Sequence, residues 1–120
     1  MSASLLPARP ESPARSLRGG DFRRITAGGA RRSGPLFTVF VLPREGVGIR
    51  TGFTAGRRIG GAVVRNRARR VMREAWRSLA QGAADGFDVV FVAQPGVRGR
   101  GLADVRSEMA RLLDAAGVLG

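Results

Sequence analysis

One stretch determines how the rest of the chain is arranged: Arg65-Asn66-Arg67-Ala68-Arg69-Arg70-Val71-Met72-Arg73-Glu74-Ala75-Trp76-Arg77, residues 65–77. Apolar residues in and beside it recur at intervals of three and four, which predicts one helix with a single apolar stripe. The stripe consists of Val64, Ala68, Val71, Met72, Ala75 and Leu79. The opposite side and its flanks carry Arg65, Asn66, Arg67, Arg69, Arg70, Arg73 and Arg77. The sequence therefore predicts a helix that buries one face and presents guanidinium groups on the other.

The charge on this helix is nearly of a single sign, because only Glu74 interrupts the arginines. Like charges three and four residues apart repel each other and destabilise an isolated helix. A solvated surface is the simplest explanation of most charged runs, but a polyanionic partner would relieve the repulsion. A run of one sign favours the second explanation and predicts nucleic-acid binding.

The composition is strongly basic and excludes several chemistries. The 120 residues suffice for one domain with a modest core, and the formal net charge is +12. All 21 basic residues are arginines, whose planar guanidinium groups bind phosphate in a bidentate manner. Cysteine, histidine and tyrosine are absent, which excludes disulfides, thiolate zinc sites and the most common general base. No apolar run approaches the roughly 20 residues of a membrane span, and residues 1–18 lack a secretory apolar region, so we expect a cytoplasmic protein with no membrane partner.

Turn residues and hydrophobic patterns divide the chain into short elements. Residues 1–16, rich in proline, serine and alanine, predict a disordered basic arm. Residues 47–55 alternate in polarity, and we expect them to pair with a strand at 35–42 as an antiparallel hairpin around a turn at 43–46. The other expected elements are a helix at 21–26, a basic loop at 56–61, a glycine-rich turn at 82–86, an inner strand at 87–93 covered on both faces, a loop at 94–101, and an amphipathic helix at 102–113 that Gly117 ends.

These elements predict a single α+β domain at residues 17–116, followed by a tail at 117–120. The helices and strands would form a two-layer sandwich with a small mixed sheet. A β-helix-β crossover would run through the arginine helix.

Catalytic groups are scarce in this sequence. Asp85 falls in a predicted turn and Asp88 at the start of a strand, while Asp104 and Glu108 fit the solvent side of the last helix. A two-metal nuclease needs several carboxylates at one site. The loop at 56–61 also lacks the phosphate-binding G-x-x-x-x-G-K-[ST] pattern. We therefore expect a protein that binds a partner and does not itself break bonds.

The side chains on the basic surface favour RNA over DNA as that partner. DNA-reading helices usually present a mixture of Asn, Gln and Arg to base edges. The helix at 65–77 offers arginines and one asparagine, which suit phosphates and RNA shape. Phe22, Phe37 and Phe40 come near basic elements and are able to stack on bases. Plain core packing is the alternative for each, and it is the better explanation for Phe37.

A longer motif gives the sequence a family resemblance. It runs Gly52-Phe53-Thr54-Ala55-Gly56-Arg57-Arg58-Ile59-Gly60-Gly61-Ala62-Val63-Val64 and continues into the helix at 65–77. A strand, a basic pair, a glycine-containing turn and an Arg-Asn-Arg helix in this order resemble the bacterial ribonuclease P protein component. The likeness extends from about Leu17 to Leu113. It implies the element order α-β-β-β-α-β-α, with a left-handed β-α-β crossover like that of the second domain of the fifth small-subunit ribosomal protein.

The resemblance also implies a function and two partners. Proteins of this family join a large catalytic RNA, and the complex hydrolyses precursor tRNA to release its 5′ leader. The RNA would hold the catalytic Mg²⁺, so that the protein would need neither a metal nor a stable protein partner. The residues implied for docking on the RNA subunit are Arg65, Asn66, Arg67, Arg69, Arg70, Arg73 and Arg77. A cleft between the first helix and the sheet would hold the single-stranded leader through Phe22, Thr26, Thr38, Phe40, Thr54, Arg57, Arg58 and Arg65.

The sequence departs from the family pattern at three places. Thr26 stands where an aromatic residue is usual, the basic pair Arg57-Arg58 is often lysine, and Gly56 replaces a common serine. Two other classes of protein fit the composition alone. A general RNA chaperone or ribosomal protein would share the charge and the mixed fold without a leader cleft, and a DNA-binding regulator would share the basic helix.

Overall fold

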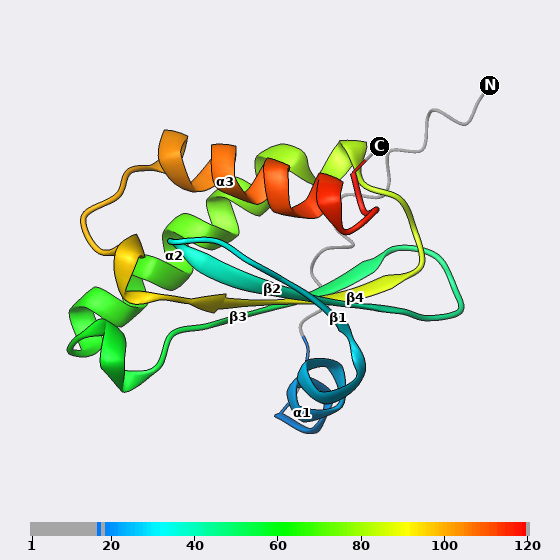
Figure 1. Cartoon of the computed structure of the whole chain (residues 1–120), viewed down its shortest axis with the longest axis horizontal. Coiled ribbons are helices and arrows are strands. Elements are labelled where there is room, and N and C mark those ends of the chain that lie inside the picture. Colours follow the sequence, from blue (N-terminus) through cyan, green and yellow to red (C-terminus); the bar gives the residue numbers. More distant parts are fainter. Residues whose placement is uncertain (1–16, 18, 120) are drawn as a thin grey trace.

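The computed structural model describes residue 17 and residues 19–119, which form three helices and one four-stranded sheet (Figure 1). The predicted arm at 1–16 lies outside the described residues. The elements are α1 (Gly19–Gly28), β1 (Ala30–Ser33), β2 (Phe37–Pro43), β3 (Ile49–Thr54), α2 (Ala62–Leu79), β4 (Phe87–Ala93) and α3 (Leu102–Ala115), with short 3₁₀ turns η2 (Arg57–Ile59), η3 (Ala80–Gly82) and η4 (Pro95–Val97). The order α-β-β-β-α-β-α is confirmed.

The last strand in the chain, β4, occupies the inside of the sheet. The strand order is β1-β2-β4-β3, with β4 antiparallel to β2 and parallel to β3. The prediction of an inner strand is therefore confirmed, and the parallel β3–α2–β4 connection is the expected crossover. The predicted hairpin between β2 and β3 is wrong, because β4 lies between them. The most apolar strand is favoured at the centre, where neighbouring strands and helices cover it.

The two faces of the sheet are covered unequally (Figure 1). Helices α2 and α3 lie together over one face, and the main core there contains Phe37, Phe91, Met72 and Met109. Phe91 is its centre, with ring centroids 6.0 Å from Phe37, 5.1 Å from Phe53 and 6.2 Å from Trp76. Phe37 is thus a core residue. The opposite face carries α1 and a smaller cluster.

That smaller cluster holds α1 on the sheet. Leu17, Ile25 and Val90 are buried together, with Phe22, Phe40, Leu42 and Val92 packed around them. Helix α1 is longer than the predicted 21–26. It ends where Gly29 passes close to the sheet: a Cβ at this position would lie 2.7 Å from the Ile25 carbonyl oxygen and 2.9 Å from that of Val41.

Strand β1 has no counterpart among the elements expected from local sequence patterns, although the family resemblance implied a third strand before α2. All four of its residues are exposed, and two of them are arginines, so it has no apolar pattern. Its pairing with β2 from Ala30↔Val41 to Ser33↔Thr38 makes it a strand. Long-range pairing of this kind leaves no mark on the local sequence.

The C-terminal helix ends as predicted but differs in which side chains it buries. Gly117 has φ +84°, the Val118 N–H donates to the Leu113 carbonyl at 2.9 Å, and Val118 is fully buried. The solvent position predicted for Glu108 is wrong. Glu108 is 8% exposed because its carboxylate accepts the Leu36 N–H at 2.9 Å and pairs with Arg111 at 3.3 Å. No helix in the described part of the chain is long and apolar enough to cross a membrane.

Candidate nucleic-acid interface

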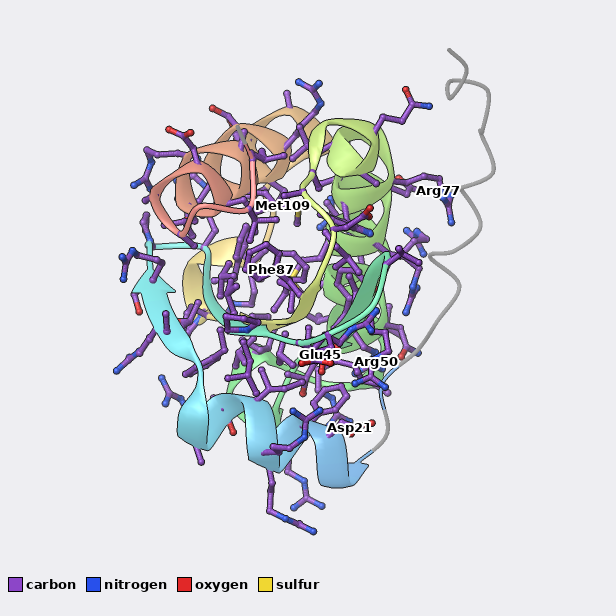
Figure 2. The ribbon with its side chains drawn as sticks, turned by 90° about the vertical axis from the view of Figure 1, so that its right-hand side faces the viewer. Asp21, Glu45, Arg50, Arg77, Phe87 and Met109 are labelled. Atoms are coloured by element: carbon purple, nitrogen blue, oxygen red, sulfur yellow. The ribbon has the colours of Figure 1, made fainter. Side chains whose placement is uncertain are left out.

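Helix α2 separates its apolar side from its arginines as the sequence predicts. Its buried residues are Ala68, Val71, Met72, Ala75 and Trp76. On the other side, Asn66, Arg70, Arg73 and Arg77 are exposed, and Arg65, Arg67 and Arg69 are half-buried. We call these seven residues the arginine face. Figure 2 shows Arg77 pointing away from the body of the molecule, whereas Phe87 and Met109 lie between the sheet and the helices.

Several contacts restrain the arginine face without hiding it. Arg67 donates from Nη2 to the Arg100 carbonyl at 3.1 Å, and Arg69 donates to the Asn66 side-chain oxygen. The guanidinium carbon of Arg73 lies 5.5 Å from the centre of the Phe53 ring, a cation–π distance. Restraint of this kind lowers the entropy lost when the side chains bind a phosphate.

Four of the residues predicted for the leader cleft lie on the face of the sheet that carries α1, which we call the α1 face. The pairings Phe40↔Val90↔Gly52 and Thr38↔Val92↔Thr54 form two successive rows across strands β2, β4 and β3. Phe22 reaches down from α1 onto the first row. A Cβ at Gly52 would lie 2.5 Å from the ring atom Cζ of Phe22, so this close approach requires glycine.

The second row carries two threonine hydroxyl groups, and hydrogen bonds hold that of Thr38 in place. The Thr38 hydroxyl lies 3.2 Å from the Ser33 hydroxyl and accepts a hydrogen bond from the Gln94 amide at 3.2 Å. Thr38 is buried, while Thr54 is half-buried at the end of β3. The α1 face therefore combines partly exposed aromatic rings with hydroxyl groups, as surfaces that bind single-stranded nucleic acid do.

The remaining residues predicted for the leader cleft lie at the margins of the α1 face. Thr26 is exposed one turn after Phe22, and its hydroxyl donates to the Phe22 carbonyl at 2.9 Å within the same helix. Arg57 and Arg58 are exposed on η2, which connects β3 to α2. Arg65 is half-buried in the first turn of α2 and follows them closely in the chain. These arginines therefore link the α1 face to the arginine face along the sequence.

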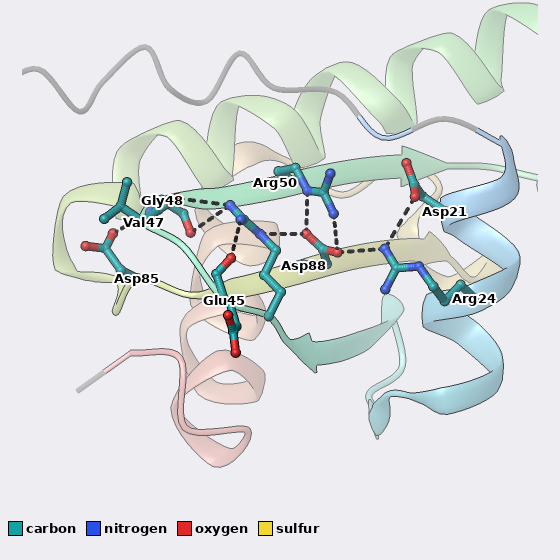
Figure 3. Close-up of polar contacts among 9 residues, drawn as sticks. Asp21, Arg24, Glu45, Val47, Gly48, Arg50, Asp85 and Asp88 are labelled. Atoms are coloured by element: carbon teal, nitrogen blue, oxygen red, sulfur yellow. Dashed lines mark hydrogen bonds and ion pairs between the residues drawn. The ribbon is translucent and has the colours of Figure 1, made fainter.

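The sequence did not identify a charged cluster centred on Asp88 (Figure 3). The Asp88 side chain is 0% exposed at the start of β4. Arg50 donates to both carboxylate oxygens at 2.8 Å, Arg24 donates at 2.9 Å, and Arg44 Nε lies at 3.1 Å. The arginines come from β3, α1 and the end of β2, so no local spacing could reveal them. Burial by itself would raise the pKa of Asp88, but the hydrogen bonds from Arg50 and Arg24 outweigh it and hold the pKa below its ordinary value.

The carboxylates of the described residues do not gather at one site. Among them, no three histidine, cysteine, aspartate or glutamate side chains lie together in a way that could hold a metal ion. The buried carboxylates have structural partners: Asp88 binds arginines, and Glu108 accepts the Leu36 N–H. What this surface offers is positive charge, hydroxyl groups and aromatic rings.

Comparisons with known proteins agree with this arrangement. A family model described as Ribonuclease P matches residues 13–117. The ribonuclease P protein component of Chloroflexus aggregans is 39% identical over 106 residues, which cover 88% of this chain and 78% of that protein. The corresponding protein of Herpetosiphon aurantiacus is 35% identical over 96 residues, covering 80% of this chain and 78% of the relative.

Solved structures show the same fold. The RNase P protein of Staphylococcus aureus matches with a TM-score of 0.78 at 21% identity, covering 88% of this chain and 97% of that one. The RNase P protein of Thermotoga maritima matches with a TM-score of 0.77 at 25% identity, covering 84% and 96%. Because the family model matches most of this chain, the chain belongs to the ribonuclease P protein family, whose members are subunits of a ribonucleoprotein endoribonuclease.

Proposed function

We propose that this chain docks on the catalytic RNA of ribonuclease P through the arginine face and holds the 5′ leader of precursor tRNA on the α1 face. The observation that carries the proposal is the separation of charge along α2: the apolar side is in the core, and a nearly unbroken row of arginines faces outward. Guanidinium groups on one rigid element match a regular array of phosphates.

The leader assignment rests on the chemistry of the α1 face. Phe22 and Phe40 are half-buried, so part of each ring is available for stacking, which suits any base. In the next row the half-buried Thr54 adds a hydroxyl group, whereas Thr38 is buried and bound to Gln94. Arg57, Arg58 and Arg65 supply charge where β3 leads into α2. A leader strand on this face would therefore reach the arginine face by way of η2.

We assign the bond-breaking step to the RNA. The chain has no histidine or cysteine, and the phosphates of the RNA subunit would hold the Mg²⁺ of the reaction. The protein would raise the affinity for precursor tRNA and screen the repulsion between two RNAs. The cytoplasm, where tRNA is processed, is the compartment that this role requires.

Reconstitution tests the proposal directly. Purified protein, freed of nucleic acid, is added to a bacterial ribonuclease P RNA at a Mg²⁺ concentration too low for the RNA alone. We expect 5′ processing to be restored and precursor tRNA to bind more tightly than mature tRNA. The protein without RNA should not process the precursor.

Two results would contradict the proposal in different ways. Cleavage by the protein alone would overturn the assignment of chemistry to the RNA. Equal binding of precursor and mature tRNA by the complex would remove the leader function and favour a general RNA-binding protein.

A further inference from the structure

The cluster around Asp88 joins the sheet to α1, and its parts are not equally rigid. Arg50 grips the carboxylate with two hydrogen bonds of 2.8 Å. Arg44 is fixed independently, because it also donates to the carbonyls of Glu45 and Val47 at 3.0 Å. Asp88, Arg44 and Arg50 therefore form a platform that belongs to the sheet.

Arg24 attaches α1 to this platform. Its Nη2 lies 2.9 Å from Asp88 and 3.3 Å from Asp21, one turn earlier in the same helix (Figure 3). Charge-assisted hydrogen bonds are directional. The apolar contacts of Ile25 and Val90 are less directional and tolerate small shifts of α1 over the sheet. Gly29 holds the C-terminal end of the helix through its one-residue link to β1, and the ion pair fixes the preceding turn over Asp88.

The position of α1 determines which residues of the sheet the Phe22 ring contacts. Asp88 pairs with Arg50, and two residues further along the same strands Val90 pairs with Gly52, which puts both pairs on the α1 face. Arg24 is bound over the first pair, and Phe22 rests over Gly52 of the second. If the Arg24–Asp88 contact is lost, a small movement of this part of α1 is enough to draw the Phe22 ring out of the gap that Gly52 leaves.

We propose that Asp88 is a positioning residue for the leader-binding surface: through Arg24 it sets the position of α1 that places the Phe22 ring on Gly52, in the row that also contains Phe40. This inference rests on the proposed leader function. Asp88 itself is fully buried and does not touch the leader. Its effect is on how the α1 face is shaped, while docking through the arginine face of α2 is independent of it.

The test uses Asp88→Asn in the full-length chain, which removes the negative charge of the side chain and keeps its size and shape. The mutant is bound to a ribonuclease P RNA at protein concentrations that saturate docking, and the affinities for precursor and mature tRNA are compared. We expect docking on the RNA to stay within about twofold, while the preference for precursor falls about tenfold, the equivalent of one stacked base. Asp114→Asn removes the same charge from an exposed site on α3 and should change neither quantity.

A second set of variants separates positioning from general stability. Arg24→Gln leaves Asp88 paired with Arg44 and Arg50, so the domain keeps its buried ion pairs. It should lower the precursor preference as Asp88→Asn does. If both act through Phe22, then combining either with Phe22→Ala should add little to the loss caused by Phe22→Ala alone. A residue that merely stabilised the fold would give additive effects.

The possible outcomes are decisive. An unchanged precursor preference in folded Asp88→Asn, additive losses with Phe22→Ala, or an equal loss of docking would each overturn the positioning role. Emission of Trp76, which lies in the main core, reports whether a variant is folded. If Asp88→Asn is unfolded, Arg24→Gln decides alone, and a retained preference overturns the inference. A wild-type complex without any preference overturns the proposed function, and this inference with it.

Discussion

Phe22 and Gly52 form the most specific contact of the candidate leader surface. The Phe22 ring occupies the space that a side chain at position 52 would need, so the ring fits there because residue 52 has no Cβ. Phe22 also belongs to the small cluster around Ile25 and Val90. Phe22 therefore has two roles to separate: packing in this cluster and stacking on a base of the leader.

Two substitutions at this residue separate them. We expect Phe22→Leu, which keeps most of the apolar volume but has no aromatic face, to leave docking on the RNA unchanged and to lower leader affinity by about 1–3 kcal/mol. Phe22→Ala should cause the same loss of leader affinity and additionally destabilise the domain, by less than the about 3–5 kcal/mol of a fully buried Phe→Ala change, because Phe22 is half-buried. The measurements are precursor tRNA binding and thermal unfolding. Normal leader affinity in Phe22→Leu would assign the residue to the core alone.

Buried carboxylates were the residues that sequence reasoning treated least well. Asp88 looked like the boundary of a strand, and Glu108 like a solvated helix residue. Each owes its place to partners from distant segments: Arg24, Arg44 and Arg50 for Asp88, and the Leu36 N–H for Glu108. Hydrophobic periodicity predicts which face of an element is buried, but it carries no information about a charge that is buried because it is paired.

At the scale of elements, α2 was the part of the chain best predicted from the sequence. Its length and strong 3.6-residue period leave one face for the core and one for the arginines. Strands β2, β3 and β4 were located but not correctly paired, and β1 was not found from local patterns. Sequence proximity and the turn at 43–46 favoured a hairpin, whereas the burial of β4 on both faces gave it the central place. The β-helix-β crossover through the arginine helix was predicted from the order of the elements, and the family motif implied only its left hand.

The arginine face predicts a defined salt dependence. We expect Arg70→Ala to weaken docking on the RNA subunit and to reduce the slope of log affinity against log salt concentration by about one unit for each phosphate that is no longer neutralised. Arg32 is an exposed arginine on the edge strand β1, so Arg32→Ala removes the same charge from another surface. It should change the affinity and the salt slope less. Binding measured between low and high salt gives both slopes. Equal slopes for the two variants would indicate a diffuse electrostatic attraction instead of a docking face.

At the scale of the whole molecule, the net charge of +12 opposes compactness, and paired carboxylates offset part of that repulsion from inside. Asp88 is the most deeply buried of them, with three arginines at its oxygens. Since its pKa is lower in the folded protein than in the unfolded chain, the folded state binds this proton less readily. The stability that Asp88 contributes is therefore present above the unfolded pKa of about 3.9 and is lost as the pH falls through the lower folded pKa.

This linkage predicts how Asp88→Asn responds to pH. At neutral pH the substitution leaves three partly exposed guanidinium groups without their counter-charge, and it should lower the free energy of unfolding by less than the about 3–5 kcal/mol of a fully buried pair. The difference in the free energy of unfolding between wild type and mutant should stay constant down to about pH 5 and narrow below about pH 4, because the unfolded wild-type chain then takes up a proton at Asp88 that the folded protein binds only at lower pH. Thermal unfolding followed by Trp76 emission at several pH values measures it. A difference that stays the same down to about pH 3 would contradict a depressed pKa.

The central place of β4 has a consequence for how the protein is made. Strands β1, β2 and β3 leave the ribosome before β4, yet β3 has its sheet partner only in β4, and β2 has its second partner there. The sheet is therefore completed only after residue 93 has been synthesised, and until then the unpaired N–H and C=O groups of β2 and β3 are open to other chains. A nascent chain rich in arginine is kept apart from its copies by charge during this interval. The charges that we propose for RNA docking on the finished subunit would thus also protect the chain while it is still incomplete.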